Sequence, residues 1–248
     1  RADVSPLWHV ALFIMLLAFS FSTPAIICAE APDSNPAPVP GDTIPPELFV
    51  HIPRYDLPTP DPAYSAPEIL SDITRGPVER MEISFTFDGG AEAEDAPIIL
   101  DALRAREITT TMFVTGQFIR KYPGIVRRMV REGHEVGNHT MTHPHLTDYA
   151  VNSTHQTASG VDRALLSKEL KETAAVFKET TGTEMAPFWR APFGEMNESI
   201  RRWAFEEGYL HVGWTADYQT RESLDTLDWV HDRSSRLYRS PDRIKVRV

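Results

Sequence analysis

Asp88 and two histidines are the first residues whose types and spacing suggest chemistry. Asp88 follows an apolar segment and precedes Gly89 and Gly90, which let the backbone turn sharply and leave room for a ligand. A carboxylate in that place can take a proton from a substrate or from water. His139 and His143 are four residues apart, and on a helical turn that spacing puts both imidazoles on one face, as in other His-x-x-x-His zinc sites. Taken separately, Asp88 also fits a plain turn residue, and the histidines fit two unrelated surface residues.

An arginine and a tryptophan further along the chain extend this set. Arg190 follows Trp189 at the end of a β-prone segment, so we expect its guanidinium to be partly desolvated and to need a carboxylate partner. Asp88 or Asp225 can supply that carboxylate, and a plain fold-stabilising ion pair is an equally simple interpretation. Trp229 fits a core residue or, because it lies close to these polar residues in the pattern, a platform for stacking a sugar ring.

The segments around these residues alternate between strand-like and helical patterns. The β-prone segments are 81–87, 108–115, 135–137, 187–190 and 209–214, and the helical ones are 93–106, 117–132, 163–181 and 197–207. Pro123 is expected to split the second helix, and 149–162 is expected to be an extended loop. Alternation of this kind predicts an α/β fold with a parallel sheet, either doubly wound or barrel-like. In both folds the working residues lie at the carboxyl ends of the strands, where Asp88, His139 and Arg190 fall.

The composition of the chain excludes several classes of protein. The 248 residues, 42% of them hydrophobic, are enough for a full-size domain with a real core. The single cysteine, Cys28, excludes an intrachain disulfide framework and a CxxC-type zinc or redox site. A net charge of −10 argues against a nucleic-acid partner, because proteins that bind nucleic acids are normally basic.

The first 78 residues differ in character from the rest. Residues 10–19 are unbroken apolar, inside a looser apolar stretch over 7–29, and small residues follow. We therefore expect residues 1–31 to be a signal peptide or, alternatively, a membrane anchor through 7–29. Of the 20 prolines, 11 lie between Pro32 and Pro67, which predicts an extended Pro-rich linker over 32–78. The protein is thus expected to be secreted, periplasmic or membrane-anchored facing outward.

Four short motifs occur in a fixed order along residues 79–248. They are Thr-Phe-Asp ending at Asp88, His-Thr-x-x-His from His139, Arg-x-Pro-x-Gly from Arg190, and Asp-x-x-Asp-Trp from Asp225. This set resembles the polysaccharide deacetylases, also described as the NodB-homology domain or carbohydrate esterase family four. The resemblance implies a distorted (β/α) barrel that hydrolyses N-acetyl groups from amino sugars in chitin-like or peptidoglycan-like polymers.

The resemblance also implies a role for each matching residue. Asp88 corresponds to the general base, Arg190 to the arginine that orients it, and Asp225 to an acidic residue that supports the charge network. The remaining matches bind the metal or the substrate: His139 and His143 are the two metal-binding histidines, a backbone N–H near Phe193 helps to hold the oxyanion, and Trp229 forms a wall of the groove.

The implied cofactor is a divalent metal, with Zn²⁺ as the first choice, and the implied partner is an N-acetylated polysaccharide or oligosaccharide. The chemistry agrees, because a bound Zn²⁺ polarises a carbonyl and makes water more acidic, and a carboxylate then takes the proton as water attacks.

Two departures from the family pattern leave alternatives open. Gly89 stands where the family usually has a second aspartate, the third metal ligand, so Asp88 itself, the acidic loop of Glu92, Glu94 and Asp95, or water would have to fill that position. The family also has a histidine that acts as the general acid, in a Leu-x-His motif. No such motif follows Trp229 in this sequence, so we expect a C-terminally incomplete domain or a natural pseudoenzyme. A catalytically inactive carbohydrate-binding protein and an amidase acting on non-sugar amides therefore remain the alternative hypotheses.

Overall fold

The computed structural model describes residues 71–76, 83–90, 92–230 and 232–247. The expected export segment 1–31, nearly all of the expected linker 32–78, and Cys28 lie outside the described residues. Within the described part of the chain, no helix has the length and apolar character needed to cross a membrane. The described residues include all four motifs.

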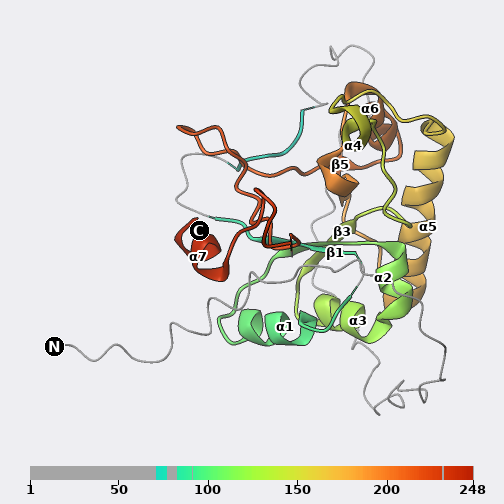
Figure 1. Ribbon diagram of the computed structural model, residues 1–248. Coiled ribbons are helices and arrows are strands. Elements are labelled where there is room, and N and C mark those ends of the chain that lie inside the picture. The colour runs from blue at the N-terminus through green and yellow to red at the C-terminus, as the bar shows by residue number, and fades with distance from the viewer. Residues whose placement is uncertain (1–70, 77–82, 91, 231, 248) are drawn as a thin grey trace, which may run out of the picture.

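A parallel sheet forms the centre of the described structure (Figure 1). Its five strands are β1 (Thr86–Gly89), β2 (Thr111–Val114), β3 (Glu135–Asn138), β4 (Phe188–Trp189) and β5 (Leu210–His211). Each strand pairs in parallel with the next one in the chain. A doubly wound sheet would reverse its strand order at a switch point, so this sequential order is that of the distorted (β/α) barrel type. Beyond β5, Ile73 pairs in parallel with Val212 and extends the sheet by one bridge.

Helices connect the strands and cover the sheet (Figure 1). They are α1 (Ala96–Arg104), α2 (Gly116–Lys121), α3 (Pro123–Arg131), α4 (Tyr149–Asn152), α5 (Arg163–Thr181), the 3₁₀ turn η4 (Pro192–Gly194), α6 (Glu198–Glu206) and α7 (Pro241–Arg247). The sequence predicted α5 with these bounds. In the structure the Asp162 carboxylate caps its first turn, and Gly182 ends it with a φ of 76°. Pro123 splits α2 from α3 as expected. The segment 149–162 is not entirely loop, since it begins with α4.

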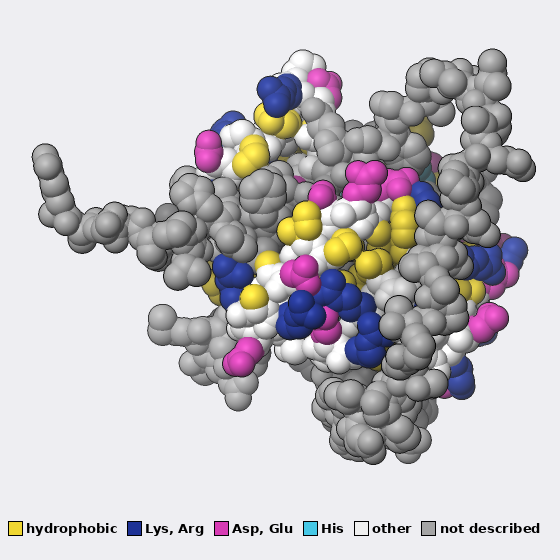
Figure 2. All heavy atoms as spheres, turned by 90° about the horizontal axis from the view of Figure 1, so that it is seen from below, with side chains coloured by type: hydrophobic (Ala, Val, Ile, Leu, Met, Phe, Trp, Pro, Cys, Tyr) yellow, Lys and Arg dark blue, Asp and Glu magenta, His cyan; other side chains and the backbone are white. Residues whose placement is uncertain are grey.

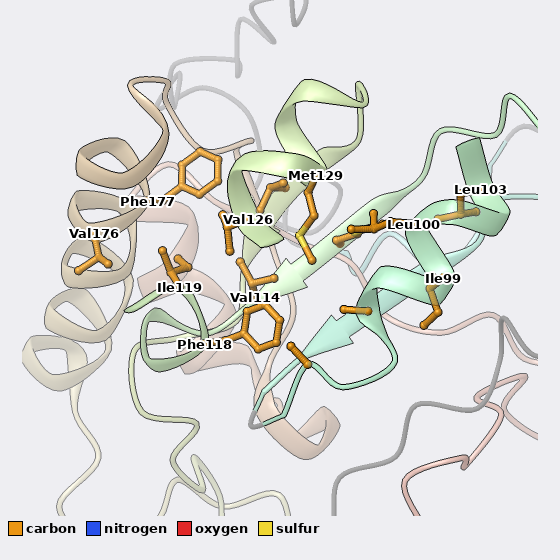
Figure 3. Close-up of a cluster of buried hydrophobic side chains, with 14 residues drawn as sticks. Ile99, Leu100, Leu103, Val114, Phe118, Ile119, Val126, Met129, Val176 and Phe177 are labelled. Carbon is orange, nitrogen blue, oxygen red and sulfur yellow. The ribbon is translucent and has the colours of Figure 1, made fainter. Parts of the chain in front are cut away.

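Two buried clusters hold the layers together. The first packs α1, α2, α3 and α5 against β2, and Figure 3 shows its side chains pointing toward one another from these elements. Phe118 of α2 and Val114 of β2 lie at its centre, and both are almost completely buried. The second lies between α5, α6 and β4, around the fully buried Trp189. Burial of apolar surface in these clusters is the main force that holds β3 and β4, and with them the site residues that follow, in place.

The outer face of α1 and α3 carries charged side chains beside apolar ones. Figure 2 views the molecule from below the orientation of Figure 1 and shows basic and acidic side chains side by side near apolar ones. Arg128 of α3 lies 2.7 Å from Asp101 of α1, a pair that links the two helices, and 2.7 Å from Glu132 at the C-terminal end of α3. Exposed pairs of this kind add little stability each, and we assign this face no role in the site.

Candidate functional site

The site lies where several strands end, because parallel strands bring their carboxyl ends to one edge of the sheet. Asp88 lies in β1, His139 follows β3 directly, and Arg190 follows β4 directly. The register pairs Asp88 with Phe113 and Asn138 with Trp189, so these three strand ends are neighbours. The structure therefore brings together side chains that lie up to about a hundred residues apart in the sequence.

Arg190 holds Asp88 by a short ion pair. The Arg190 Nη1 donates to Asp88 Oδ1 at 2.7 Å, and its Nε donates to the Val212 carbonyl at 3.0 Å. The guanidinium lies over the rings of Phe113 and Trp214, 4.4 and 4.8 Å from their centroids. Arg190 is only 2% exposed, which makes it more buried than the sequence predicted, whereas the Asp88 side chain is 29% exposed. A fixed, buried cation thus orients a carboxylate that solvent or a substrate can reach.

His139 and His143 lie side by side, with ring centroids 4.8 Å apart. The His139 Nδ1 is 2.8 Å from the Arg190 carbonyl, and because a carbonyl only accepts, Nδ1 carries the proton and Nε2 keeps its lone pair. Burial lowers the pKa of His139, and burial together with His139 lowers the pKa of His143 to about 4. Both imidazoles are therefore neutral at pH 7, which is the form that binds a metal.

The helical turn expected between the two histidines is wrong. Residues 139–143 form an irregular loop in which Thr140 has a φ of 66° and His143 a φ of 58°. Asn138 Oδ1 accepts the Thr140 N–H at 2.9 Å, and Thr140 Oγ1 accepts the His143 N–H at 3.2 Å. Left-handed backbone in a β-branched residue costs about 1–3 kcal/mol and persists only where the surroundings enforce it. The spacing of four thus brings the imidazoles together through two left-handed residues.

Asp225 interacts with the charges of Asp88 and Arg190, and the Trp229 side chain hydrogen-bonds to Asp225. Burial raises the pKa of Asp225, and the charge of Asp88 raises it further, while hydrogen bonds from the Leu227 N–H and the Trp229 side chain act against this. Trp229 is 50% exposed, so it is not a core residue. Next to it, a cavity of about 260 Å³ is lined by Glu222, Ser223, Asp225, Leu227 and Arg239.

Phe193 lies on the histidine side of the site. Its backbone is left-handed, with a φ of 57°, and its side chain is 53% exposed. The ring stacks on His145 with centroids 4.0 Å apart and an interplanar angle of 9°, and its other neighbour is His143 at 4.5 Å. Phe193 therefore forms an exposed aromatic surface directly beside the paired imidazoles.

The described residues place two candidate metal ligands, His139 and His143, side by side but hold no complete ligand set. They contain no group of three His, Cys, Asp or Glu side chains that could hold a metal ion. Glu92, one of the expected replacements for a ligand at position 89, instead pairs with Lys121 at 2.9 Å and accepts from Tyr122 at 2.6 Å. Two neutral imidazoles next to a carboxylate have the donor chemistry that a Zn²⁺ site uses, so the residues fit the group in ligand type and fall short in number.

Two buried glutamates that the sequence reading did not include also belong to the site. Glu169 and Glu195 are 6% and 1% exposed, and both accept hydrogen bonds from the loop that carries the histidines. A signal was present for each. Glu169 falls on the apolar stripe of α5 next to Leu166 and Leu170, and Glu195 comes directly after the Arg-x-Pro-x-Gly motif.

Comparison with known proteins finds relatives of this chain in both sequence and fold. The sequence profile of the family described as polysaccharide deacetylase matches residues 75–212. A peptidoglycan-N-acetylglucosamine deacetylase of Bacillus cereus is 34% identical over 155 residues, which are 62% of this chain and 48% of the relative. A chitooligosaccharide deacetylase of a Bradyrhizobium strain is 30% identical over 158 residues, 64% of this chain and 63% of the relative. The chain thus spans about half to two thirds of the length of these relatives.

Solved structures show the same fold. A family 4 carbohydrate esterase from Bacillus anthracis has 30% identity and a TM-score of 0.52, covering 58% of this chain and 64% of its own. A family 4 pseudoenzyme from the same organism has 20% identity and a TM-score of 0.57, covering 72% of this chain and 53% of its own. The second likeness concerns the fold alone.

Proposed function

The chain belongs to the polysaccharide deacetylase family, and from that premise we propose that it hydrolyses N-acetyl groups of amino sugars in a polysaccharide or oligosaccharide. One observation carries the proposal: a carboxylate fixed by a buried arginine lies next to two neutral imidazoles at the edge of the sheet. The chitin-like or peptidoglycan-like nature of the polymer is proposed from the relatives, which are named as deacetylases of peptidoglycan and chitooligosaccharides.

Asp88 is the general base of the proposed reaction. Its carboxylate is partly open to solvent, so a water molecule between it and the acetamide can lose a proton to it while attacking the carbonyl carbon. Arg190 keeps the carboxylate in one orientation through the 2.7 Å ion pair. The carbon–nitrogen bond then breaks, and the amine leaves with a proton, which Asp88 can return.

The other site residues bind the substrate and its developing charge. The backbone N–H near Phe193 is proposed as a donor to the oxyanion. Loss of one such donor typically lowers the rate by a factor of about 10²–10³. The exposed rings of Phe193 and Trp229 are proposed surfaces for the sugar, and Asp225 is proposed to support the charge network through the attraction between its carboxylate and Arg190.

We propose that His139 and His143 hold a divalent metal, Zn²⁺ before others. When bound, such a metal polarises the acetyl carbonyl and makes the attacking water more acidic. The chain prepares both ligands for it, since the Arg190 carbonyl fixes the tautomer of His139 and burial keeps both rings neutral.

Acetate release from N-acetylglucosamine oligomers, with and without chelator, tests this proposal. We expect release by the full chain that falls to background with chelator and returns when Zn²⁺ is added. No release, or release that is indifferent to chelator, would contradict a metal-dependent deacetylase.

A carbohydrate-binding pseudoenzyme is the second candidate. Two observations favour it: Gly89 stands at the usual place of a ligand, and the described residues lack a third ligand. It predicts oligosaccharide binding through Trp229 without turnover, and binding that Asp88→Asn does not change. Calorimetric titration with N-acetylglucosamine oligomers, run beside the acetate assay, distinguishes it from the enzyme.

We also propose that the protein acts outside the cytoplasm, secreted, periplasmic or held at a membrane through residues 7–29. The apolar stretch at the start of the sequence and the polymeric substrate support this proposal. Fractionation of cells that express the full chain tests it, and retention in the cytoplasm would contradict it.

A further inference from the structure

The loop that carries the histidines, residues 139–147, is held at both ends by buried carboxylates. At its first half, Glu169 of α5 accepts the Met141 and Thr142 N–H groups at 2.8 Å each and the Thr142 hydroxyl at 2.9 Å. At its second half, Glu195 accepts the Leu146 N–H at 2.8 Å and the Thr147 N–H at 2.9 Å.

Glu195 also reaches the aromatic residues around the histidines. Its Oε1 is 2.7 Å from His145 Nδ1, and the His145 ring stacks on Phe193, which lies against His143. One carboxylate therefore fixes the backbone on one side of His143 and, through His145, the aromatic surface against which His143 packs.

Burial of these two carboxylates is energetically unfavourable, which indicates that they have a specific role at the site. Glu169 is 6% and Glu195 1% exposed, and neither has a Lys or Arg partner among the described residues. Burying a carboxylate without a cation is unfavourable unless hydrogen bonds satisfy it. Both carboxylates accept hydrogen bonds from the same loop. In that loop Thr140 and His143 have left-handed backbones, and a strained backbone persists only where its surroundings enforce it.

We propose that Glu169 and Glu195 are positioning residues that hold the histidine loop in its strained form and thereby keep His139 and His143 side by side. The part that concerns metal binding rests on the proposed function, whereas the part that concerns the loop does not. The ligand class is a divalent cation, and the expected effect follows outer-shell partners in general, whose loss weakens metal binding about 10–100-fold.

The test compares Glu169→Gln and Glu195→Gln with control substitutions three residues further along the chain. Glu172→Gln lies on α5 and Glu198→Gln on α6, and both side chains are exposed, at 47% and 75%. Amide hydrogen exchange of the metal-free full chain is the first measurement. We expect exchange at least about tenfold faster at residues 141–142 for Glu169→Gln and at 146–147 for Glu195→Gln, with β2 and both controls unchanged.

Titration with Co²⁺, followed by its visible absorption, is the second measurement. We expect the dissociation constant to rise about 10–100-fold in both Gln variants and to stay within about twofold in the controls. Co²⁺ binding as tight as in the unmodified chain, or exchange that rises evenly over the whole protein, would overturn the proposal, because either result describes a residue that only stabilises the fold.

Two further arms keep the outcomes separate. If the unmodified chain does not bind Co²⁺, the metal part of the proposed function fails, and the exchange measurement still decides whether the glutamates hold the loop. If a Gln variant does not unfold cooperatively, Glu169→Asp or Glu195→Asp takes its place. These keep the charge but are one methylene shorter, so we expect intermediate exchange and Co²⁺ affinity, and values equal to those of the unmodified chain would overturn the proposal.

Discussion

The histidine loop and the C-terminal segment over residues 213–247 both contribute to the site, but they are built differently. The loop is fixed by partners distant in sequence: the first N–H groups of α2 donate to the Thr140 and Met141 carbonyls, and Glu169 and Glu195 accept from its amides. In the C-terminal segment, Asp217, Asp225 and Asp232 each accept from the backbone two or three residues later.

This difference indicates which half of the site is preorganised by the fold. Long-range hydrogen bonds and burial preorganise the half with the base and the histidines, whereas local turns shape the half with Asp225 and Trp229. A substitution in the first half should therefore change the stability of the whole fold more than one in the second half, whose larger effect should be on ligand binding. The following predictions test this contrast.

The largest effect on stability is expected for Arg190→Met. The change removes the buried cation and leaves Asp88 and the Val212 carbonyl without their donors. We expect the free energy of unfolding to fall by about 3 kcal/mol, the lower end for a broken buried ion pair, because Asp88 keeps access to water. Urea unfolding measures it. Arg239→Met, which removes an arginine with local carbonyl partners in the C-terminal segment, should change the value by no more than about 0.5 kcal/mol.

Gly116→Ala tests how tightly the histidine loop packs on α2. A Cβ at residue 116 would lie 2.0 Å from Met141 Sδ, so the loop or the helix has to move. We expect a loss of about 2 kcal/mol in the free energy of unfolding, typical of overpacking. Gly124→Ala in α3, where a Cβ meets nothing within 4 Å, should leave the stability equal or slightly higher. Equal losses for both would show that the loop is not tightly packed.

Two titratable groups outside the histidine loop, His134 and Asp225, should respond to pH in opposite directions. Burial lowers the pKa of His134, just before β3, below its usual 6.5, so its contribution is complete above pH 6.5 and is lost as the pH falls below that value. Burial raises the pKa of Asp225 above 3.8, so its contribution is complete below pH 3.8 and is lost as the pH rises through the raised pKa.

Urea unfolding between pH 3 and 8 measures both responses. The His134→Gln variant should lose part of the fall in stability below pH 6.5, and Asp225→Asn should lose part of the fall above pH 3.8. The slope for either residue cannot exceed about 1.4 kcal/mol per pH unit, the value for one proton. If both substitutions change the pH dependence of the free energy of unfolding in the same direction, the opposite pKa shifts assigned to His134 and Asp225 are wrong.

The smallest effect on stability is expected for Trp229→Ala. Its ring is half exposed, so the free energy of unfolding should change by no more than about 0.5 kcal/mol. Oligosaccharide affinity should fall about tenfold, because an aromatic contact contributes about 0.5–1.5 kcal/mol beyond its buried area. Leu237→Ala, also 50% exposed in the same segment, is the control that should leave affinity unchanged. A large loss of stability would place Trp229 in the core.

Sequence patterns predicted where the strands end and which polar residues follow them, because both depend on residues that are close together in the sequence. The charged Arg190 after a β-prone segment required a carboxylate, and Asp88 is its partner. The order of the helices and strands followed from periodicity, and Pro123 marked the break between α2 and α3.

The conformation of the histidine loop did not follow from the sequence. Thr140 is β-branched and rarely left-handed, so nothing local predicts its φ of 66°, which depends on Glu169 and Asn138. The place of Glu169 on the apolar stripe of α5 indicates that it faces inward, but it does not indicate which N–H groups the carboxylate binds. Contacts between residues far apart in sequence decide both features, and a single sequence does not display them.

The central claim is that Asp88, held by Arg190, is the base of an amide hydrolysis. The most direct measurement is the rate of acetate release from N-acetylglucosamine oligomers by the full chain, its Asp88→Asn variant and the control Asp101→Asn, an aspartate of α1 whose side chain is 59% exposed. We predict a loss of about 10²–10⁴-fold for Asp88→Asn and a rate within about twofold of the unmodified chain for Asp101→Asn. An Asp88→Asn variant that releases acetate as fast as the unmodified chain would contradict the claim.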